Sequence, residues 1–287
     1  MSEIQEAVRR LIRGEAVRVY RIHPQLVALW VANHERNVRD GFYKPWEGIR
    51  YYGRSPSACR VYSPVAARTL ELRDELHFFG VMYLERLGVS QLYETVPLLP
   101  REATGVTARE LGLTCPRYRD SDEERILTTS LVATRYEAGG QAQQLAIETR
   151  YAGEVAGRCR KAVRCDLAIQ QAYWIARGAT WRLLTDLDLP AQRYRNLAWL
   201  RLPWLLTRGE WPQAELHRYA ARFCVAWAQD LSLGQILDRL AARHGGTRQQ
   251  QFGGFACAVW ADALRLDLEQ ERLNLKRPIR FAQRDGR

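Results

Sequence analysis

Residues 126–151 contain the pattern that most limits how this chain can fold. The run ILTTSLVATR at 126–135 is rich in β-branched residues, and a second apolar run, QLAIETRY, occupies 144–151. Between them lies the turn sequence EAGG at 137–140. Two strand-like runs on either side of a glycine-containing turn predict an antiparallel hairpin.

The segments after the hairpin predict how it is covered. Residues 160–177 have apolar side chains at helical spacing and are followed by Gly178, a typical residue just past a helix. Residues 180–185 (TWRLLT) are again strand-like, and a helix is expected at 190–200. A hairpin, a helix and a further strand in this order predict an α/β arrangement.

Upstream of the hairpin, the apolar spacing predicts further helices and one strand. The expected segments are a helical region at 1–40, a turn-rich basic loop at 51–63, an amphipathic helix at 68–88, a strand at 89–99 and a charged loop at 101–124.

The C-terminal part has a different, mainly helical pattern. Helices are expected at 212–229 and at 232–244, where Ser232 and Gln235 fit a capping box. Residues 252–268 predict a short helix that leads into a strand. This order in a basic protein is typical of a winged-helix module, although a plain helical packing domain fits equally well.

We therefore predict three regions. They are an N-terminal helical region at 1–50, an α/β domain at 51–203 and a winged-helix-like domain at 204–287.

Charge points to the kind of partner. The chain has 43 Lys and Arg against 32 Asp and Glu, a net charge of +11, and such a balance favours nucleic acid. A basic protein with a solvated arginine surface is the alternative. The arginines that we expect to contact DNA phosphates are Arg54, Arg60, Arg68, Arg239, Arg243 and Arg248.

Other sequence features exclude several classes of protein. No apolar run reaches the roughly 18 residues that a membrane span needs, and the N-terminus lacks the apolar core of a signal peptide. We expect a cytoplasmic, bacterial protein without a membrane partner. The six cysteines include no C-x-x-C pair, so a zinc site is not expected.

An acidic and a basic residue end the second strand of the hairpin. Glu148, Thr149 and Arg150 form an acid-x-basic triplet, and the helix upstream carries Asp74 and Glu75. Metal-dependent nucleases use carboxylates in this setting to hold Mg²⁺ beside the scissile phosphate, with a lysine nearby to stabilise charge. Taken alone, such a triplet is more often part of an exposed strand face.

The whole pattern resembles the TnsA-type endonuclease subunit of heteromeric transposases, over about residues 53–279. The aromatic-rich helix followed by G-x-x-W-x-L-L-T-D and N-L-x-W-L is its most specific part. The segments that carry the resemblance are GRSPSACRVYSPVAAR (53–68), ELRDELHFFGVMYLERLG (71–88), ILTTSLVA (126–133), LAIETRYA (145–152), LAIQQAYWIARGATWRLLTD (167–186) and RNLAWL (195–200).

The resemblance implies both a fold and a role. The fold is a restriction-endonuclease-like (PD-(D/E)xK) N-terminal domain with a mainly helical, winged-helix C-terminal domain. The role is to cut the 5′ strands at double-stranded transposon ends while a DDE transposase subunit cuts and joins the 3′ strands. An AAA+ regulator is the further partner, usually met through the C-terminal region.

Carried over to this sequence, the family's catalytic positions include two substitutions. The helix glutamate corresponds to Glu75, with Asp74 as a near miss, and the carboxylate before the lysine corresponds to Glu148. Ser130 stands where the family has a metal-binding aspartate, and Arg150 stands where it has the catalytic lysine. Serine lacks the charge to hold Mg²⁺ tightly, and arginine is bulkier than lysine and remains protonated.

These substitutions lead to the leading hypothesis and two alternatives. We expect a pseudoenzyme that binds transposon ends and its partners, with cleavage impaired or lost and Mg²⁺ held only weakly by Glu75 and Glu148, if at all. The first alternative is an active Mg²⁺-dependent endonuclease in which Asp74 or Asp122 replaces the missing ligand. The second is a non-enzymatic winged-helix regulator or defence component.

Overall fold

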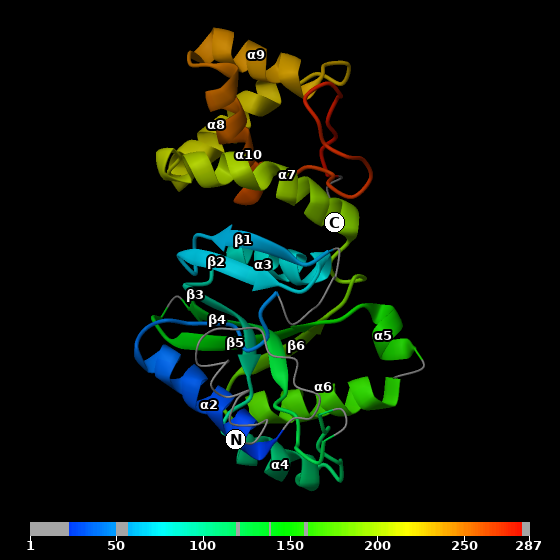
Figure 1. The fold of residues 1–287 in the computed structure, drawn as a ribbon. Coiled ribbons are helices and arrows are strands. Elements are labelled where there is room, and N and C mark those ends of the chain that lie inside the picture. Colours follow the sequence, from blue (N-terminus) through cyan, green and yellow to red (C-terminus); the bar gives the residue numbers. More distant parts are fainter. Residues whose placement is uncertain (1–22, 50–56, 119–120, 138, 158–159, 283–287) are drawn as a thin grey trace.

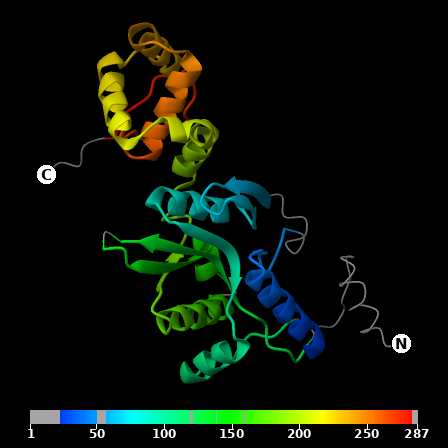
Figure 2. The same ribbon diagram turned by 90° about the vertical axis from the view of Figure 1, so that its left-hand side faces the viewer.

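The computed structural model describes residues 23–49, 57–118, 121–137, 139–157 and 160–282. Within these ranges the chain is mixed α/β, with one four-stranded and one two-stranded sheet (Figure 1). The larger sheet lies toward one end of an elongated molecule, and a group of helices forms the other end (Figure 2).

The four-stranded sheet contains the predicted hairpin. Its order is β3 (Gln91–Pro97), β4 (Thr128–Tyr136), β5 (Ala142–Thr149) and β6 (Thr180–Leu184). The first three strands are antiparallel, and β6 lies parallel to β5. Parallel neighbours need a crossover, which contains α6 (Arg160–Ile175). The strands and the helix predicted for this part of the chain are confirmed.

Helices cover both faces of this sheet. Leu131 of β4 packs with α3 (Glu75–Leu87), whereas its neighbour Val132 packs with Ile169 of α6. Successive strand residues point to opposite faces, so both must be apolar when both faces are covered. The continuous apolar runs LVA in β4 and LAI in β5 follow from this arrangement.

Two short strands correct the predictions for 51–63 and 68–88. β1 (Cys59–Ser63) pairs with β2 (Arg68–Leu72), so the predicted loop ends in a strand and the predicted helix begins with one. Leu70 and Leu72 are both fully buried, at the two-residue spacing of a strand. The helix begins only at Glu75, because Asp74 caps its first turn. Residues 50–56 lie outside the described residues.

Helix α4 (Arg101–Glu110) corrects the charged loop predicted at 101–124. Its buried face is narrow and includes Thr104 and Ala108, four residues apart. So few apolar positions in a charged segment give a weak periodic signal. A short helix, α5 (Ala152–Ala156), precedes α6.

The C-terminal part is helical, as predicted. Its elements are α7 (Ala191–Thr207), the 3₁₀ turn η1 (Arg208–Glu210), α8 (Gln213–Ala226), α9 (Leu233–His244) and α10 (Arg248–Trp260). The capping box of Ser232 and Gln235 is confirmed at the start of α9. The helix expected at 252–268 begins earlier, and in the described chain only a single bridge, Leu266 to Phe281, stands where a strand was expected.

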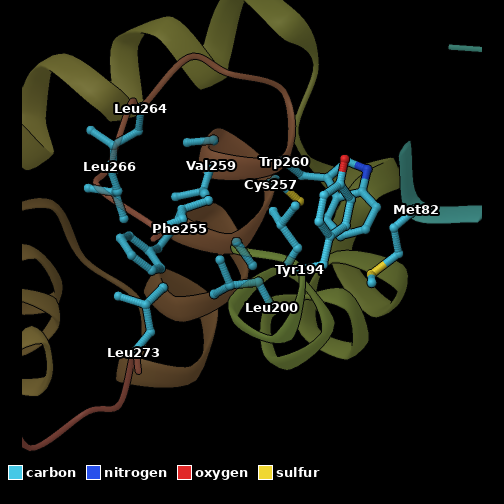
Figure 3. Close-up of a cluster of buried hydrophobic side chains, with 14 of the residues drawn as sticks. Met82, Tyr194, Leu200, Phe255, Cys257, Val259, Trp260, Leu264, Leu266 and Leu273 are labelled. Carbon is cyan, nitrogen blue, oxygen red and sulfur yellow. The ribbon is translucent and has the colours of Figure 1, made fainter. Parts of the chain in front are cut away.

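Helix α10 is enclosed by the rest of this part. Every residue from Gly253 to Trp260 is buried. A Cβ atom at Gly253 would lie 2.7 Å from the Thr207 side chain, and one at Gly254 would lie 2.7 Å from the Trp211 ring. Figure 3 shows side chains of α10 meeting those of α7 and of the segment that follows α10 in one cluster.

A buried ion pair joins the α/β part to the helical part. Arg201 of α7 donates two hydrogen bonds to the carboxylate of Glu85 in α3, at 2.8 and 3.0 Å, and one to the Tyr62 carbonyl at 2.6 Å. The Ser63 hydroxyl donates to the same carboxylate at 2.9 Å. The predicted division after residue 203 falls inside α7, and the three-region division stays a prediction.

The first described element is α2 (Pro24–Arg39), so part of the helical region predicted at 1–40 is confirmed. Residues 1–22 lie outside the described residues. No helix in the described ranges combines the length and apolar character needed to cross a membrane.

Candidate functional site

The backbone of Ser130 in β4 is not paired with either neighbouring strand, β3 or β5. The register between β3 and β4 skips the pair of Thr95 and Ser130, and the register between β4 and β5 ends at Leu131 and Ile147. Thr95 has a positive φ of 48°, and its carbonyl accepts a hydrogen bond from the Trp46 N–H instead (3.0 Å). The strands therefore separate locally at the residue where the sequence predicted a degraded metal ligand.

At this point the backbone groups form hydrogen bonds with side chains rather than with the neighbouring strands. The Ser130 N–H donates to Glu148 Oε2 at 2.8 Å, and the Ser130 hydroxyl donates to the same oxygen at 2.9 Å. The Thr149 N–H donates to Ser130 Oγ at 3.1 Å. On the other side, the Ser130 carbonyl accepts from His77 Nε2 at 2.9 Å.

Both oxygens of the Glu148 carboxylate have partners within the protein. Glu148 is only 1% exposed. Its Oε2 accepts the two bonds from Ser130, and its Oε1 lies 2.8 Å from Arg150 Nε in an ion pair. Arg150 is also 3.8 Å from Glu154. A buried carboxylate needs such compensation, and here a guanidinium supplies the positive charge.

The start of α3 is tied to both strands of the hairpin. Arg73 donates to the Asp74 carboxylate and to the Thr149 carbonyl, both at 2.8 Å. Asp74 also accepts from the His77 N–H at 2.8 Å. Since His77 Nδ1 accepts from the Arg73 N–H at 3.3 Å, Nε2 is the protonated nitrogen that donates to Ser130.

These contacts change the pKa values of two groups. Burial, and then the charge of Arg73, lowers the pKa of His77 to about 4, so the ring is neutral at pH 7. Burial alone would raise the pKa of Asp74, but the charge and hydrogen bond of Arg73 and the His77 N–H lower it overall.

Two further carboxyl groups, those of Glu47 and Asp166, interact with these side chains. Burial raises the pKa of Glu47 and of Asp166, and the positive charge of Arg125 opposes both shifts. Arg125 forms an ion pair with Asp166 of α6. Both carboxyl groups also interact electrostatically with Glu148 and Arg150.

We call this group of side chains the polar cluster. Its members are Glu47, Arg73, Asp74, His77, Arg125, Ser130, Glu148, Arg150 and Asp166.

Of the predicted catalytic positions, Ser130, Glu148 and Arg150 come together and Glu75 does not join them. Both Glu75 oxygens accept hydrogen bonds from Arg195 of α7, each at 2.9 Å, in a partly exposed pair. The near-miss residue Asp74 lies in the polar cluster instead. Asp122, considered as a substitute ligand, is 90% exposed and 3.6 Å from Arg117.

The arginines predicted as DNA contacts in the N-terminal half are engaged or undescribed. Arg68 donates two hydrogen bonds to the buried carboxylate of Glu94, at 2.5 and 2.8 Å, so it has a structural role. Arg60 pairs with Glu71 at 2.8 Å in an exposed position. Arg54 lies outside the described residues.

Of the three arginines predicted as DNA contacts in the C-terminal part, two are exposed and unpaired among the described residues. Arg239 and Arg243 are exposed on α9 and make no ion pair with a described residue. They line a surface depression of about 590 Å³ together with Val225 and Ala226 of α8. Arg248 differs, because it pairs with Asp238.

Sequence reasoning missed five members of the polar cluster: Glu47, Arg73, His77, Arg125 and Asp166. The weak signal was the spacing of Arg73 and His77, four residues apart at the start of a helix, which allows contact across one turn. Nothing in the sequence connects Arg125 with Asp166, which meet only through the fold.

The residues present do not fit a Mg²⁺ site in this arrangement. Mg²⁺ requires oxygen ligands in near-octahedral geometry. The oxygens of Glu148 are held by Ser130 and Arg150, and those of Glu75 by Arg195. In the described part of the chain, no three His, Cys, Asp or Glu side chains are grouped as a metal site would need.

No family model and no curated protein sequence matches this chain.

Proposed function

We propose that this chain is a TnsA-like subunit of a DNA transposition machinery, which binds transposon-end DNA and its partner proteins without cutting. The observation that carries the proposal is the position of the Arg150 guanidinium. It stands 2.8 Å from the carboxylate of Glu148, in a nuclease-like hairpin, where a cutting enzyme needs a divalent cation.

The α/β part supports the proposal through its element order. A glutamate-bearing helix, a hairpin ending in Glu148 and Arg150, a crossover helix and a parallel strand agree with the fold that the family resemblance implies. Glu148 meets Ser130 across the separated strands, as two metal ligands would. The winged-helix and restriction-endonuclease-like identities of the two parts belong to the same proposal.

The polar cluster contains three guanidinium groups that suit phosphate. Arginine recognises phosphate oxygens through paired N–H donors, so Arg73, Arg125 and Arg150 are the groups here that could contact a phosphate. Each of them also pairs with a carboxyl group. A phosphodiester would compete with those carboxylates, and its binding there would hold DNA rather than activate water.

The helical part supports DNA and partner binding through its outer surface. Since α10 is enclosed, the exposed arginines Arg239 and Arg243 of α9 are the better candidates for phosphate contact. On α7, Leu202 and Leu206 are 63% and 70% exposed, an apolar surface suited to a protein partner. We propose that the DDE transposase subunit or the AAA+ regulator contacts this part.

A nicking assay tests the loss of cleavage. The full chain is incubated with end-labelled transposon-end duplex in Mg²⁺ or Mn²⁺, beside the double variant Ser130→Asp, Arg150→Lys. We expect no cutting by the natural chain and nicking by the double variant. Cutting by the natural chain that disappears in Glu148→Ala would show an active endonuclease instead.

A binding assay tests the role of α9. We expect the double variant Arg239→Ala, Arg243→Ala to bind duplex DNA more weakly and to lower the slope of log affinity against log salt by about 2, because each lost phosphate contact removes about 0.9. The control is Arg135→Ala, which changes an exposed arginine at the far end of β4. Equal salt slopes for the natural chain and the double variant would contradict this role.

A winged-helix DNA-binding regulator is the second candidate, favoured by one observation. The segment after α10 pairs with itself at the bridge of Leu266 and Phe281, and the bridge of Ser232 and Pro278 ties it back to the start of α9, as strands do in a winged helix. This candidate predicts sequence-specific binding that depends on Arg239, Arg243 and Arg248. Binding to transposon ends without preference for one sequence would count against it.

A further inference from the structure

An aromatic cavity lies between α2 and the segment that leads from it to the sheet. Its volume is about 270 Å³, and α2 contributes Trp30, Asn33, His34 and Asn37 to its wall. These residues are three or four positions apart, so they share one face of the helix. Trp46 and Tyr118 also line the cavity, and α2 lies beside the sheet in Figure 2.

The rings around this cavity are held in place by one another. Trp30 meets Tyr118 edge to face, with centroids 6.2 Å apart, and His34 meets Trp46 in the same way at 5.8 Å. The Trp46 backbone is fixed to β3 by its hydrogen bond to Thr95. The rings are therefore held before any ligand arrives, which reduces the entropy cost of binding.

Two side-chain amides in the wall of the cavity have unused hydrogen-bonding groups. The side-chain amides of Asn33 and Asn37 are partly exposed and make no hydrogen bond with a described residue. Each amide offers both donors and an acceptor. An apolar side chain of a partner protein would leave these amides unpaired, whereas the edge of a nucleobase would satisfy them.

The cavity adjoins the polar cluster. Glu47 lines the cavity and interacts electrostatically with Arg73, Arg125 and Arg150. A ligand whose planar part enters the cavity would therefore have its attached groups beside three guanidinium groups. The exposed Lys44 also lines the cavity and adds a further positive charge.

We propose that this cavity binds a single unstacked nucleobase, with the phosphate of the same nucleotide beside the polar cluster. The inference rests on the proposed DNA binding and adds to it a preference for DNA that contains an unpaired base. Aromatic side chains stack on bases of any kind, so this preference does not depend on base identity. The volume, below the roughly 300 Å³ typical of the smallest drug-sized pockets, suits one base rather than a larger ligand.

The test compares three DNA probes of the same length and a mononucleotide. The DNA probes are a fully paired duplex, a duplex with one unpaired base and a single strand, and binding is followed by fluorescence anisotropy. We expect the natural chain to bind the duplex with the unpaired base about tenfold more tightly than the paired one. Trp46→Ala and Asn37→Leu should remove this preference and leave affinity for the paired duplex unchanged.

One control variant and a second test variant complete this design. Phe42→Ala removes a 70% exposed ring from the same segment without touching the cavity, and it should keep the preference. Asn37→Leu changes a side chain that makes no described hydrogen bond, so it serves if Trp46→Ala does not fold. Thermal unfolding of each variant checks the fold.

The outcomes separate this inference from the proposed function. Binding to the paired duplex without any preference for the unpaired base overturns the inference and leaves the proposed function standing. If no DNA probe binds, the proposed function fails, and the mononucleotide then decides for the cavity. If the mononucleotide quenches tryptophan fluorescence and Asn37→Leu abolishes this quenching, the cavity is a base site for free nucleotides. If the mononucleotide causes no quenching, the base site is overturned.

Discussion

Arg150 and Glu148 form a pair in which the two partners differ in exposure. Glu148 is almost completely buried, whereas the side chain of Arg150 is 27% exposed. Removing the guanidinium would leave the carboxylate with only its two bonds from Ser130 and no positive charge in contact. Removing one partner of this pair should therefore lower the stability of the fold more than the intact pair raises it.

We expect Arg150→Ala to lower the free energy of unfolding by about 3 kcal/mol, the size typical of an uncompensated buried charge. Arg60→Ala is the matched control, because the pair of Arg60 and Glu71 is exposed and should contribute less than about 1 kcal/mol. Urea unfolding followed by circular dichroism measures both. Similar losses for the two variants would contradict this account of Glu148.

His77 should make stability depend on pH. Its pKa is about 4 in the folded chain and near 6.5 when unfolded, so between these values only the unfolded chain takes up the proton. The contribution is complete above pH 6.5 and is lost as pH falls toward 4, by about 3 kcal/mol in all.

The measurement is the urea midpoint of the natural chain and of His77→Gln between pH 7 and pH 4.5. Asp74, Glu47 and Asp166 titrate nearby, so the difference between the two proteins isolates the imidazole. We expect the natural chain to lose more stability over this range than the variant. Parallel curves would show that His77 does not titrate in this way.

At the residue scale, the sequence predicted only the part of the site that follows from local pattern. Glu148 and Arg150 could be found because they end a recognisable strand, and Ser130 because it lies at the centre of the preceding one. Arg125 and Asp166 are 41 residues apart, and no local rule joins them. The sequence favours Glu75 over its neighbour Asp74, whereas the structure places Asp74 in the polar cluster. The difference arises because Asp74 caps α3, and the cap sets the direction of each side chain at the start of the helix.

Among the elements, α3 is held unusually close to the sheet at Gly80. A Cβ atom there would lie 2.9 Å from Leu131 and 3.0 Å from Thr149. The absence of a side chain lets α3 approach both strands of the hairpin, so that His77 of the preceding turn can reach Ser130. This close approach positions the polar cluster.

We expect Gly80→Val to destabilise the chain by about 2 kcal/mol, since a branched side chain cannot fit without moving α3 or the strands. Gly153→Ala is the control, because nothing lies within 4 Å of a Cβ atom there. That change should be neutral or slightly stabilising in α5. Thermal unfolding of both variants checks the prediction, and an unchanged Tm for Gly80→Val would contradict it.

The elements that the sequence predicted are those with a long, uninterrupted pattern. The hairpin, α6 and α9 were found because apolar residues repeat over their whole length. β2 was absorbed into a predicted helix because Leu72 and Leu76 are four residues apart across the boundary at Asp74. The cap at Asp74 was the available sign that the helix begins later.

For the whole molecule, the buried pair of Arg201 and Glu85 makes α7 part of both halves. One hydrophobic cluster also runs from Leu70 in β2 to Ile279 near the C-terminus. We therefore expect the described parts to unfold in one cooperative step. Tryptophan fluorescence reports on both parts, because Trp174 and Trp181 lie in the α/β part and Trp204 and Trp260 in the helical part. It should show one transition that coincides with circular dichroism during urea unfolding.

Arg201→Ala should lower stability by about 3–5 kcal/mol, because Glu85 stays buried with its charge uncompensated. The double variant Glu85→Leu, Arg201→Leu removes both charges and should lose less. Two separated unfolding transitions in the natural chain, or a double variant worse than the single one, would count against this coupling.

The contacts of Ser130 and Arg150 with Glu148 also limit which residues can stand at positions 130 and 150. An aspartate at position 130 would add a second carboxylate against Glu148, and a lysine at position 150 would replace the planar group that now lies 2.8 Å from it. Either change alone would disturb an arrangement that fits the other residue. The two positions are therefore expected to be epistatic, so that Ser130→Asp or Arg150→Lys alone should disturb the site more than the two changes made together.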